Sequence, residues 1–597
     1  MVLPPRPGLE PDRSIQTQVF RQASSKTTSK EPPVFPGLST KKSPPRQRLL
    51  KERAPAPPDH SRTPLAGSRP TTATGNIHEV FHVQIPFWDH NQPIVEKAKE
   101  KEMASHDKFG TFIEVDEASL SKEDKEKMLP STWSIVYKGD PKDGNVKAQL
   151  CVRGDKEKGV ENIRTNSPTV NAESLRLLLT FAASTGLKIN SLDFSSAFVQ
   201  GKDIERTVFL RPPPDIRAKR PGMVWRVVKR LYGFKDASRG WMLALDSELK
   251  RLGMVRSDFD KGLYMWYKDG QLAGLLGIHV DDILHVGPLE MYNTVITALK
   301  NKYVIGAEDD QAFTFVGWNL KQTQEGIQLS QQDYLSKTNM EEFQHLRRYA
   351  LSDKEILSDK EQADYRRLNG ILGWLAASLH PSLSFHYSVS SGKIGNATHG
   401  DAKFLIRLLD KTKKECAEIR FSNHGPIQDW TIEIFIDASP GKAKVYDSII
   451  GETVLIKSGK SGLRNIFSWR SKKLDIPTAT PLEAEAEALL EGYAKLKNVH
   501  YLMKEIFDKE FLSEIITDSK SLASSINSDN AAGKSRKIAI AVIMAQKLME
   551  EDAQIKLVWT EGQKNPADLM TKGTSDPRLM FELLAQGRSD LMTSSNR

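Results

Sequence analysis

Cysteine is nearly absent from the sequence, since only Cys151 and Cys416 occur among 597 residues. Two cysteines cannot build a disulfide framework or a zinc site made mainly of thiolates, so we expect a reducing compartment. No stretch reaches the ~18 consecutive apolar residues of a membrane span, and the start MVLPPRPGLE lacks the apolar core of a signal peptide. These absences predict a soluble chain with no membrane partner.

Most of the net positive charge lies in the N-terminal segment. Residues 1–75 hold 13 basic and 5 acidic residues and 14 of the 31 prolines, whereas the remaining 522 residues carry a net charge of only +1. A segment that buries too little apolar surface to offset its ordering entropy stays unfolded. We therefore predict a disordered, basic, Pro-rich tail over 1–77. Its cluster KKSPPRQR at 41–48 could attract polyanions, direct nuclear import or be a solvated linker.

The length and the patterning of the rest predict several domains. One hydrophobic core stops growing at ~250–300 residues, so a chain of this length should form three or four units. Residues 90–130 have a charged helical pattern, strand and helix patterns alternate over 145–320, and 331–425 is mainly helical. The strand TIEIFIDAS then begins a second α/β unit that runs to about 575. The expected fold class is α+β.

Three carboxylates fall inside or directly after buried strand patterns. Asp281 and Asp282 interrupt the apolar run GLLGIHVDDILHVG, which predicts a hairpin with both acids at its tip, and Asp193 ends the strand pattern LKINSLDF. Clustered carboxylates raise one another's pKa unless cations neutralise them, and Mg²⁺ suits oxygen ligands. Two such ions stabilise an in-line phosphoryl displacement, so the pattern predicts polymerase or nuclease chemistry. A surface Asp-Asp turn is the alternative.

Ordered motifs carry a resemblance to a known family. LDFSSAFVQG, WRVVKRLYGFKDASRGW at 225–241 and IHVDDILHVG resemble, in order and spacing, the reverse transcriptase of copia-type LTR retrotransposons. KAQLCVRG at 147–154 resembles the fingers motif of that family. The resemblance covers roughly 130–575 and implies a right-hand polymerase with fingers, palm and thumb.

The resemblance also implies roles for residues of this sequence. Asp193, Asp281 and Asp282 would be the catalytic palm acids, of which Asp193 and Asp281 would hold two Mg²⁺, with Mn²⁺ as a substitute. Lys147 and Arg153 would face the deoxynucleotide triphosphate, and Phe198 would exclude a ribose 2′-OH. The other expected partners are the RNA template, the DNA primer and the RNA–DNA hybrid.

Four positions depart from the family pattern. His279 stands where the family has Tyr, Gln149 where Arg is common, and Asp236 and Ser238 replace residues of the family's LKQAPR. A carboxylate at 236 close to a polyphosphate would add repulsion of ~1–4 kcal/mol. These departures support an alternative function, in which a degenerate or host-retained copy binds nucleic acid without polymerising. The presence of all the expected metal-site acids favours the enzyme over this alternative.

A second set of acids lies in the C-terminal unit. Asp437 ends the strand TIEIFIDAS and Asp518 ends an apolar run at SEIITDSKS, with the helix PLEAEAEALLEGYAKL between them. At ~100° per residue, Glu485 lies about 60° from Leu482 and flanks the packed face of this helix, while Glu483 lies on the other flank. We favour Glu485 as the site residue and keep Glu483 as the alternative.

The motif NPADLMTK at 565–572 supplies a further acid, Asp568, just after a helix-start signal at which Asp is also common as a cap. Together IDAS, SWRSKK at 468–473, the EAEA helix, TDSKS and NPADLMTK resemble the RNase H domain that follows the polymerase in copia-type elements. The resemblance implies a second catalytic site with two Mg²⁺. Its implied catalytic acids and metal ligands are Asp437, Glu485, Asp518 and Asp568.

The C-terminal unit also departs from the family pattern at some positions. Ala486 stands where the family helix has Tyr, and no histidine follows His500, although many RNase H folds carry one before the last acid.

We expect a location in cytoplasmic virus-like particles, with the nucleus as an alternative, and leave the oligomeric state open. The expected segments are 78–330 for fingers and palm, 331–425 for thumb and connection, 426–578 for an RNase H-like domain and 579–597 for a C-terminal tail. The chain would then be the C-terminal part of a Pol polyprotein.

Overall fold

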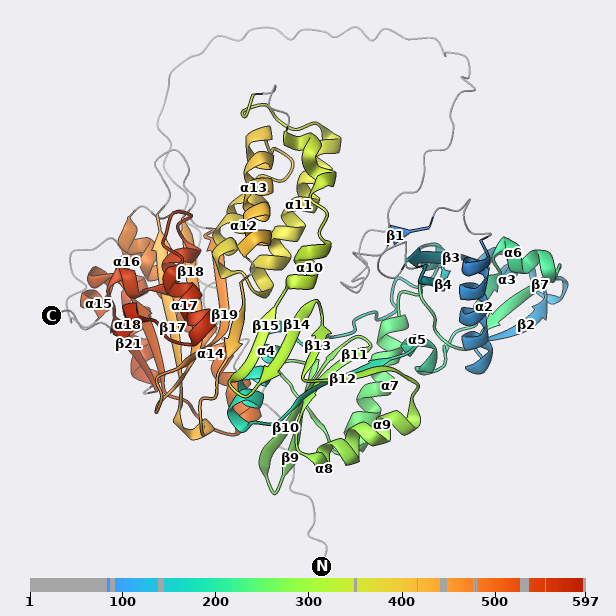
Figure 1. Cartoon of the computed structure of the whole chain (residues 1–597), viewed down its shortest axis with the longest axis horizontal. Helices are drawn as coiled ribbons and strands as arrows, with labels where there is room; N and C mark the ends of the chain where they lie inside the picture. Colours follow the sequence, from blue (N-terminus) through green and yellow to red (C-terminus); the bar gives the residue numbers. More distant parts are fainter. Residues whose placement is uncertain are drawn as a thin grey trace, which may run out of the picture. The chain divides into compact units, whose positions relative to one another are not determined.

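The computed structural model describes residues 83–85, 92–137, 144–347, 352–415, 417–440, 448–475, 478, 480–526, 536–552 and 554–593. Helices and strands are mixed throughout these residues, which confirms the expected fold class (Figure 1). The predicted tail over 1–77, with its basic cluster, lies outside the described residues. Within them, no helix is both long enough and apolar enough to cross a membrane.

The first sheet lies close to the N-terminal end of the described chain and has the order β1-β3-β6-β7-β2, with β4 paired to β3. The helical expectation for 90–130 is wrong at β2, which pairs antiparallel with β7. The ring of Phe112 stacks on Trp225 at 4.6 Å, so tertiary packing overrides the charged, helix-favouring surroundings. The elements are β1 (Val83–Gln84), α2 (Pro93–Lys108), β2 (Phe112–Asp116), α3 (Lys122–Lys127), β3 (Leu129–Tyr137), β4 (Val146–Val152), β6 (Phe209–Arg211), α6 (Pro214–Lys219) and β7 (Met223–Val227).

The second sheet has the order β12-β5-β11-β10-β9-β8 and contains the predicted hairpin as β10 and β11. Leu192, Ile278 and Ile283 pack on the buried Trp241, which makes this face of the sheet a continuous core. The elements are α4 (Ala172–Thr185), β5 (Ile189–Phe194), α5 (Ala197–Gln200), α7 (Ala237–Arg251), β8 (Val255–Arg256), β9 (Leu263–Lys268), β10 (Gln271–His279), β11 (Asp282–Val286), α8 (Leu289–Met291), α9 (Thr297–Lys302) and β12 (Ile305–Asp310).

A four-stranded sheet and a group of helices follow. The sheet has the order β13-β14-β15-β16, and its last strand comes from the segment that was expected to be mainly helical. The long helix α11 begins at a capping box made by Ser358 and Glu361, a local signal that defines its start. The elements are β13 (Ala312–Phe315), β14 (Trp318–Thr323), β15 (Gly326–Ser330), α10 (Gln332–Lys337), α11 (Asp359–Ser378), α12 (Ser384–Ser391), α13 (His399–Glu415) and β16 (Ile419–Phe421).

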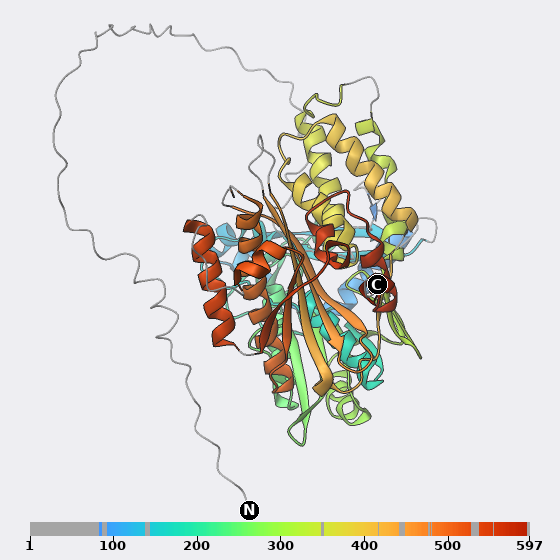
Figure 2. The ribbon, with the colours of Figure 1, turned by 90° about the vertical axis from the view of Figure 1, so that its left-hand side faces the viewer.

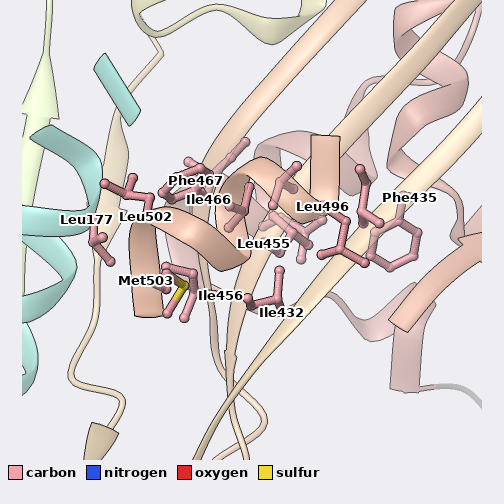
Figure 3. Packing of buried hydrophobic residues seen from close by; sticks show 14 of the residues in the cluster. Leu177, Ile432, Phe435, Leu455, Ile456, Ile466, Phe467, Leu496, Leu502 and Met503 are labelled. Carbon is pink, nitrogen blue, oxygen red and sulfur yellow. The ribbon is translucent and has the colours of Figure 1, made fainter. Parts of the chain in front are cut away.

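The C-terminal sheet has the order β19-β18-β17-β20-β21, with β17 antiparallel to β18 and parallel to β20. Its long strands lie side by side in Figure 2, with helices against them. Leu496, Leu502 and Met503 of α14 pack among Ile432 and Leu455 of the sheet (Figure 3). The elements are β17 (Trp430–Ser439), β18 (Ile449–Ser458), β19 (Arg464–Lys473), α14 (Pro481–Phe507), β20 (Ser513–Thr517), α15 (Lys520–Ile526), α16 (Arg536–Glu551), β21 (Ile555–Trp559), the 3₁₀ helix η11 (Pro566–Met570), α17 (Arg578–Gln586) and α18 (Asp590–Thr593).

A buried arginine joins α4, α11 and β19. The Nη2 atom of Arg176 donates to the carbonyl oxygens of Ala377 and Ser378 at 2.8 Å, and Nη1 donates to that of Phe467 at 3.3 Å. The guanidinium also lies 4.1 Å from the ring centre of Trp469. Burial lowers the pKa of Arg176 to about 10. Carbonyl oxygens at the C-terminal end of α11 and in β19 therefore accept hydrogen bonds from this buried charge.

Candidate active sites

The first group of acids forms where β5 meets the β10–β11 hairpin. Asp193 and Asp282 are direct cross-strand partners, and Asp281 occupies the turn between the hairpin strands. The backbone N–H of Phe194 donates to the carbonyl oxygen of Asp281 at 3.1 Å, which holds the turn against β5. Burial, and then the charges of Asp281 and Asp193, raise the pKa of Asp282 to about 8. The three acids are therefore close enough to repel one another.

The hairpin turn is strained and is held from the core. Val280 has a φ of 59°, in the left-handed region that a β-branched residue rarely adopts. The indole N–H of Trp241 donates to its carbonyl oxygen at 2.9 Å. Trp241 is itself fixed by an edge-on contact with Phe194 at 4.9 Å. A rigid core residue thus sets the position of the two turn acids.

A cavity of about 320 Å³ lies beside these acids. Asp193 and Asp281 line it, and Lys147 and Gln149 of β4 and Lys101 of α2 line it as well. The two lysines bring positive charge to the cavity, which Glu102 of α2 also lines, and a polyphosphate needs such positive charge for binding.

The structure separates the other predicted nucleotide contacts from this cavity. Arg153 forms an ion pair with Asp155 at 2.8 Å and is not among the lining residues. Phe198 packs into the core, with its ring centre 4.8 Å from that of Tyr232, and it is Tyr232 that lines the cavity. Phe198 could then exclude a ribose 2′-OH only through Tyr232, or after its own side chain had moved towards the cavity.

The sequence analysis did not identify Tyr232 as part of this site, and it also missed Lys101 and Gly306. Lys101 belongs to a charged helix with no motif, so nothing in its local sequence marks it. Gly306 lies at an irregularity of β12 opposite Asp193, and a Cβ atom there would lie 2.2 Å from Asp193 Oδ2. An isolated glycine in a strand pattern often marks such a close approach, which is the signal that could have found it.

The repulsion expected from Asp236 is a point that the structure corrects. Its carboxylate is buried and accepts hydrogen bonds from Arg206 at 3.0 and 3.1 Å and from Arg230 at 2.8 Å. Burial alone would raise the pKa of Asp236, but the two arginines hold it below its usual range. Asp236 does not line the cavity. Its charge is therefore compensated within the protein.

The second group of acids lies at one end of the C-terminal sheet. Carboxylate oxygens of Asp437, Asp518 and Asp568 lie within 4.8 Å of one another. The Asn565 amide donates to the carbonyl oxygen of Ile436 at 2.9 Å, which fixes η11 beside β17. A Cβ atom at Gly451 of β18 would lie 2.6 Å from Met570 Cβ, so the approach of η11 to the sheet requires a glycine there.

Glu485 of α14 lies near this group. Burial, and then the charges of Asp437 and Asp518, raise the pKa of Glu485 to about 8. Its Oε2 atom is buried and has no hydrogen-bond partner among the residues that the structure describes. Glu483 is also buried, and its backbone N–H is capped by Thr480 Oγ1 at 3.2 Å. The choice of Glu485 over Glu483 as the catalytic acid stays a prediction.

The donor atoms of both groups suit a hard divalent cation. In the C-terminal group, three carboxylates offer oxygen atoms close to one another, and the buried Oε2 of Glu485 could add a fourth ligand. Among the described residues, the palm acids do not form a comparable group of three. Mg²⁺ is usually held by one or two carboxylates, with substrate phosphates and water as its other ligands, so Asp193 and Asp281 also fit.

Comparisons with known proteins agree with the predicted motifs. Residues 118–350 match the family model described as reverse transcriptase (RNA-dependent DNA polymerase). A Pol polyprotein from transposon TNT 1-94 of Nicotiana tabacum is 25% identical over 82% of this chain and 37% of its own length. One from transposon RE2 of Arabidopsis thaliana is 27% identical over 60% of this chain and 25% of its own length. The chain thus spans little more than a third, or less, of these relatives.

Two solved structures show a partial likeness to this chain. A foamy viral protease–reverse transcriptase in complex with double-stranded DNA has a TM-score of 0.47 and 13% identity, covering 79% of this chain and 70% of that one. LC11-RNase H1 in complex with an RNA/DNA hybrid has a TM-score of 0.19 and 20% identity, covering 24% of this chain and 93% of that one.

Residues 118–350 thus resemble a reverse transcriptase domain, and Asp193 and Asp281, which line the cavity, lie within these residues. The curated relatives specify the class further. They confirm the predicted resemblance to the reverse transcriptases of copia-type LTR retrotransposons.

Proposed function

We propose that the chain is an RNA-directed DNA polymerase that extends a DNA primer on an RNA template. The observation that carries this proposal is a cavity lined by Asp193 and Asp281 together with Lys147 and Lys101. Asp193 and Asp281 would hold two Mg²⁺, or Mn²⁺, which would neutralise charge developing on the reacting oxygens. Asp282 supports the geometry as the cross-strand partner of Asp193.

The remaining roles belong to side chains of the chain itself. Lys147 and Lys101 bind the triphosphate and orient its α-phosphate toward the primer 3′-OH. Phe198 supports Tyr232 at the wall of the cavity, where a ribose 2′-OH would be excluded. Preorganised charges, rather than proton transfer by side chains, supply the larger part of catalysis.

A second activity, cleavage of RNA in an RNA–DNA hybrid, belongs to the C-terminal site. Asp437, Asp518 and Asp568 would hold two further Mg²⁺ together with Glu485. These acids come from separate elements, namely a strand, a loop, a helix start and a second helix. Their convergence from such different parts of the chain supports a shared role in one site. Cleavage of the template would release the new DNA strand.

The proposed domain organisation and cellular location of the chain are based on its relatives. The names of these relatives describe Pol or Gag-Pol polyproteins of transposons. We infer segments 78–330, 331–425 and 426–578 for fingers and palm, thumb and connection, and RNase H, and action inside virus-like particles. Between the sites the hybrid would lie along a positively charged surface.

A polymerase that has lost nucleotide binding remains the second candidate. Its support is Gln149, which lines the cavity at a position where the family commonly has arginine. Primer extension by the purified chain on an RNA template with Mg²⁺ and deoxynucleotides tests the choice. Extension supports the polymerase, whereas hybrid binding without extension supports the second candidate.

A further inference from the structure

Lys572 follows the last acid of the C-terminal group and points back at it. Its Nζ atom forms an ion pair with Asp568 and lies 3.4 Å from Asp437 Oδ2. Thr571 donates a hydrogen bond to Asp437, and Ser575 donates one to Asp568. The ammonium therefore occupies a position among the carboxylates that a bound cation would also seek.

The charges around Lys572 are unbalanced. Its charge opposes the pKa increase that burial causes at Asp437, Glu485 and Asp518 alike. Among the described residues, no other Lys or Arg side chain forms an ion pair with Asp437 or Asp568. One lysine thus partly neutralises four neighbouring acids.

We propose that Lys572 is an internal counterion that competes with divalent metal for Asp437 and Asp568. The proposal rests on the proposed function only in that these acids bind Mg²⁺. The lysine side chain is 42% exposed, so it can move into solvent when metal binds. An ammonium group and a divalent cation on the same two carboxylates repel each other, so the lysine must withdraw first.

This role makes Lys572 a positioning residue with two opposite effects. Without metal, it holds η11 against β17 by joining Asp568 to Asp437. With metal, it is a competitor whose removal strengthens metal binding. A lysine that only supported the structure would show the first effect and not the second.

The test uses the full chain carrying Asp193→Asn and Asp281→Asn, so that Mg²⁺ binding at the polymerase site is suppressed. Calorimetric titration with MgCl₂ compares this chain with versions that also carry Lys572→Met or Lys572→Arg. The control is Lys556→Met, because Lys556 is an exposed lysine of the same sheet. Thermal unfolding in EDTA is measured for each.

Lys572→Met should bind Mg²⁺ about tenfold more tightly and unfold at a lower temperature in EDTA, while Lys572→Arg and Lys556→Met stay close to the parent. Unchanged or weaker Mg²⁺ binding in Lys572→Met would overturn the competition. Asp437→Asn in the same background separates the two proposals. If Asp437→Asn leaves Mg²⁺ binding intact, the acids are not the metal site and the proposed cleavage function fails as well.

Discussion

Asp193 and Asp282 face each other as cross-strand partners of β5 and β11, with Asp281 beside them in the hairpin turn. Two acids in this register can share a partly buried position only if one is protonated or a cation lies between them. The raised pKa of Asp282 is the expected sign of the first case in the metal-free protein. A divalent cation at these acids, as proposed above, would favour their ionised forms and displace this proton.

Replacing Asp193 or Asp281 with Asn should reduce Mg²⁺-dependent deoxynucleotide incorporation a thousandfold or more, about 4 kcal/mol of transition-state stabilisation. The reason is that each proposed ligand serves both ions. Asp310→Asn is the matched control, since Asp310 is an exposed acid at the far end of β12. Near-normal incorporation by both site variants, measured by primer extension, would remove these residues from the metal site.

Phe198→Ala should raise the incorporation of ribonucleotides relative to deoxynucleotides, because Tyr232 would lose the ring that supports it at the cavity wall. The measurement is the ratio of kcat/KM for the two substrate classes. Tyr232→Ala should shift this ratio in the same direction. If Tyr232→Ala shifts the ratio and Phe198→Ala does not, selection belongs to Tyr232 alone.

The local sequence was sufficient to predict which strands, turns and helices carry the acids. The β10–β11 hairpin could be predicted because two apolar runs flank Asp281 and Asp282, and a polar interruption of a buried pattern indicates a turn. The strand before Asp193 and the helix that carries Glu485 could be predicted for the same reason, since periodicity is a local property.

Contacts between distant segments could not be predicted. Lys572 matters because η11 lies beside β17, and no local pattern encodes that approach. Gly306 marks a close approach in its own strand, but its sequence does not say that the neighbour is Asp193 of β5. One partner of Asp236 was equally hidden, since Arg206 is thirty residues away in sequence, whereas Arg230 is only six residues away. A carboxylate that looked repulsive in the sequence is therefore an internal ion pair in the fold.

Asp236→Asn should lower the free energy of unfolding by about 3–5 kcal/mol, because it removes the carboxylate that both Arg206 and Arg230 contact. Urea denaturation followed by circular dichroism measures the change. Asp203→Asn should cost less than about 1 kcal/mol, since Asp203 is 65% exposed and pairs with Lys229 at the surface. Equal effects of the two substitutions would mean that the buried network contributes no more than a surface pair.

Without metal, the free energy of unfolding should fall as pH rises from 6.5 to 8. Asp282 and Glu485 each have a folded pKa of about 8, above their ordinary values of 3.8 and 4.5. The folded state therefore retains protons that the unfolded state has lost, and stability decreases with pH in this window. Buried His285 and His380, whose pKa is lowered from 6.5 to about 4, are neutral in the folded state there. In the unfolded state they still lose protons near pH 6.5, which opposes the decline at the low end of the window, so the decline should be clearest towards pH 8.

Urea titrations in EDTA at several pH values test this dependence. The control is the chain with Asp282→Asn and Glu485→Gln, in which the decline between pH 6.5 and 8 should be largely lost. Saturating Mg²⁺ should also flatten it in the unmodified chain, because bound cations favour the ionised acids. An equal slope in the unmodified and doubly substituted chains would contradict the assignment of the slope to these two acids.

Glu485→Gln should abolish cleavage of RNA in a hybrid and leave primer extension intact, whereas Glu483→Gln should leave both nearly normal. The physical reason is that Asp437 and Asp518 raise the pKa of Glu485, which places its carboxylate within their electrostatic reach, while Glu483 lies in the capped first turn of α14. Cleavage of a labelled hybrid and extension of a labelled primer are measured on the same preparations. The reverse pattern would assign the fourth acid to Glu483, and loss of both activities in Glu485→Gln would indicate that the substitution disrupts folding.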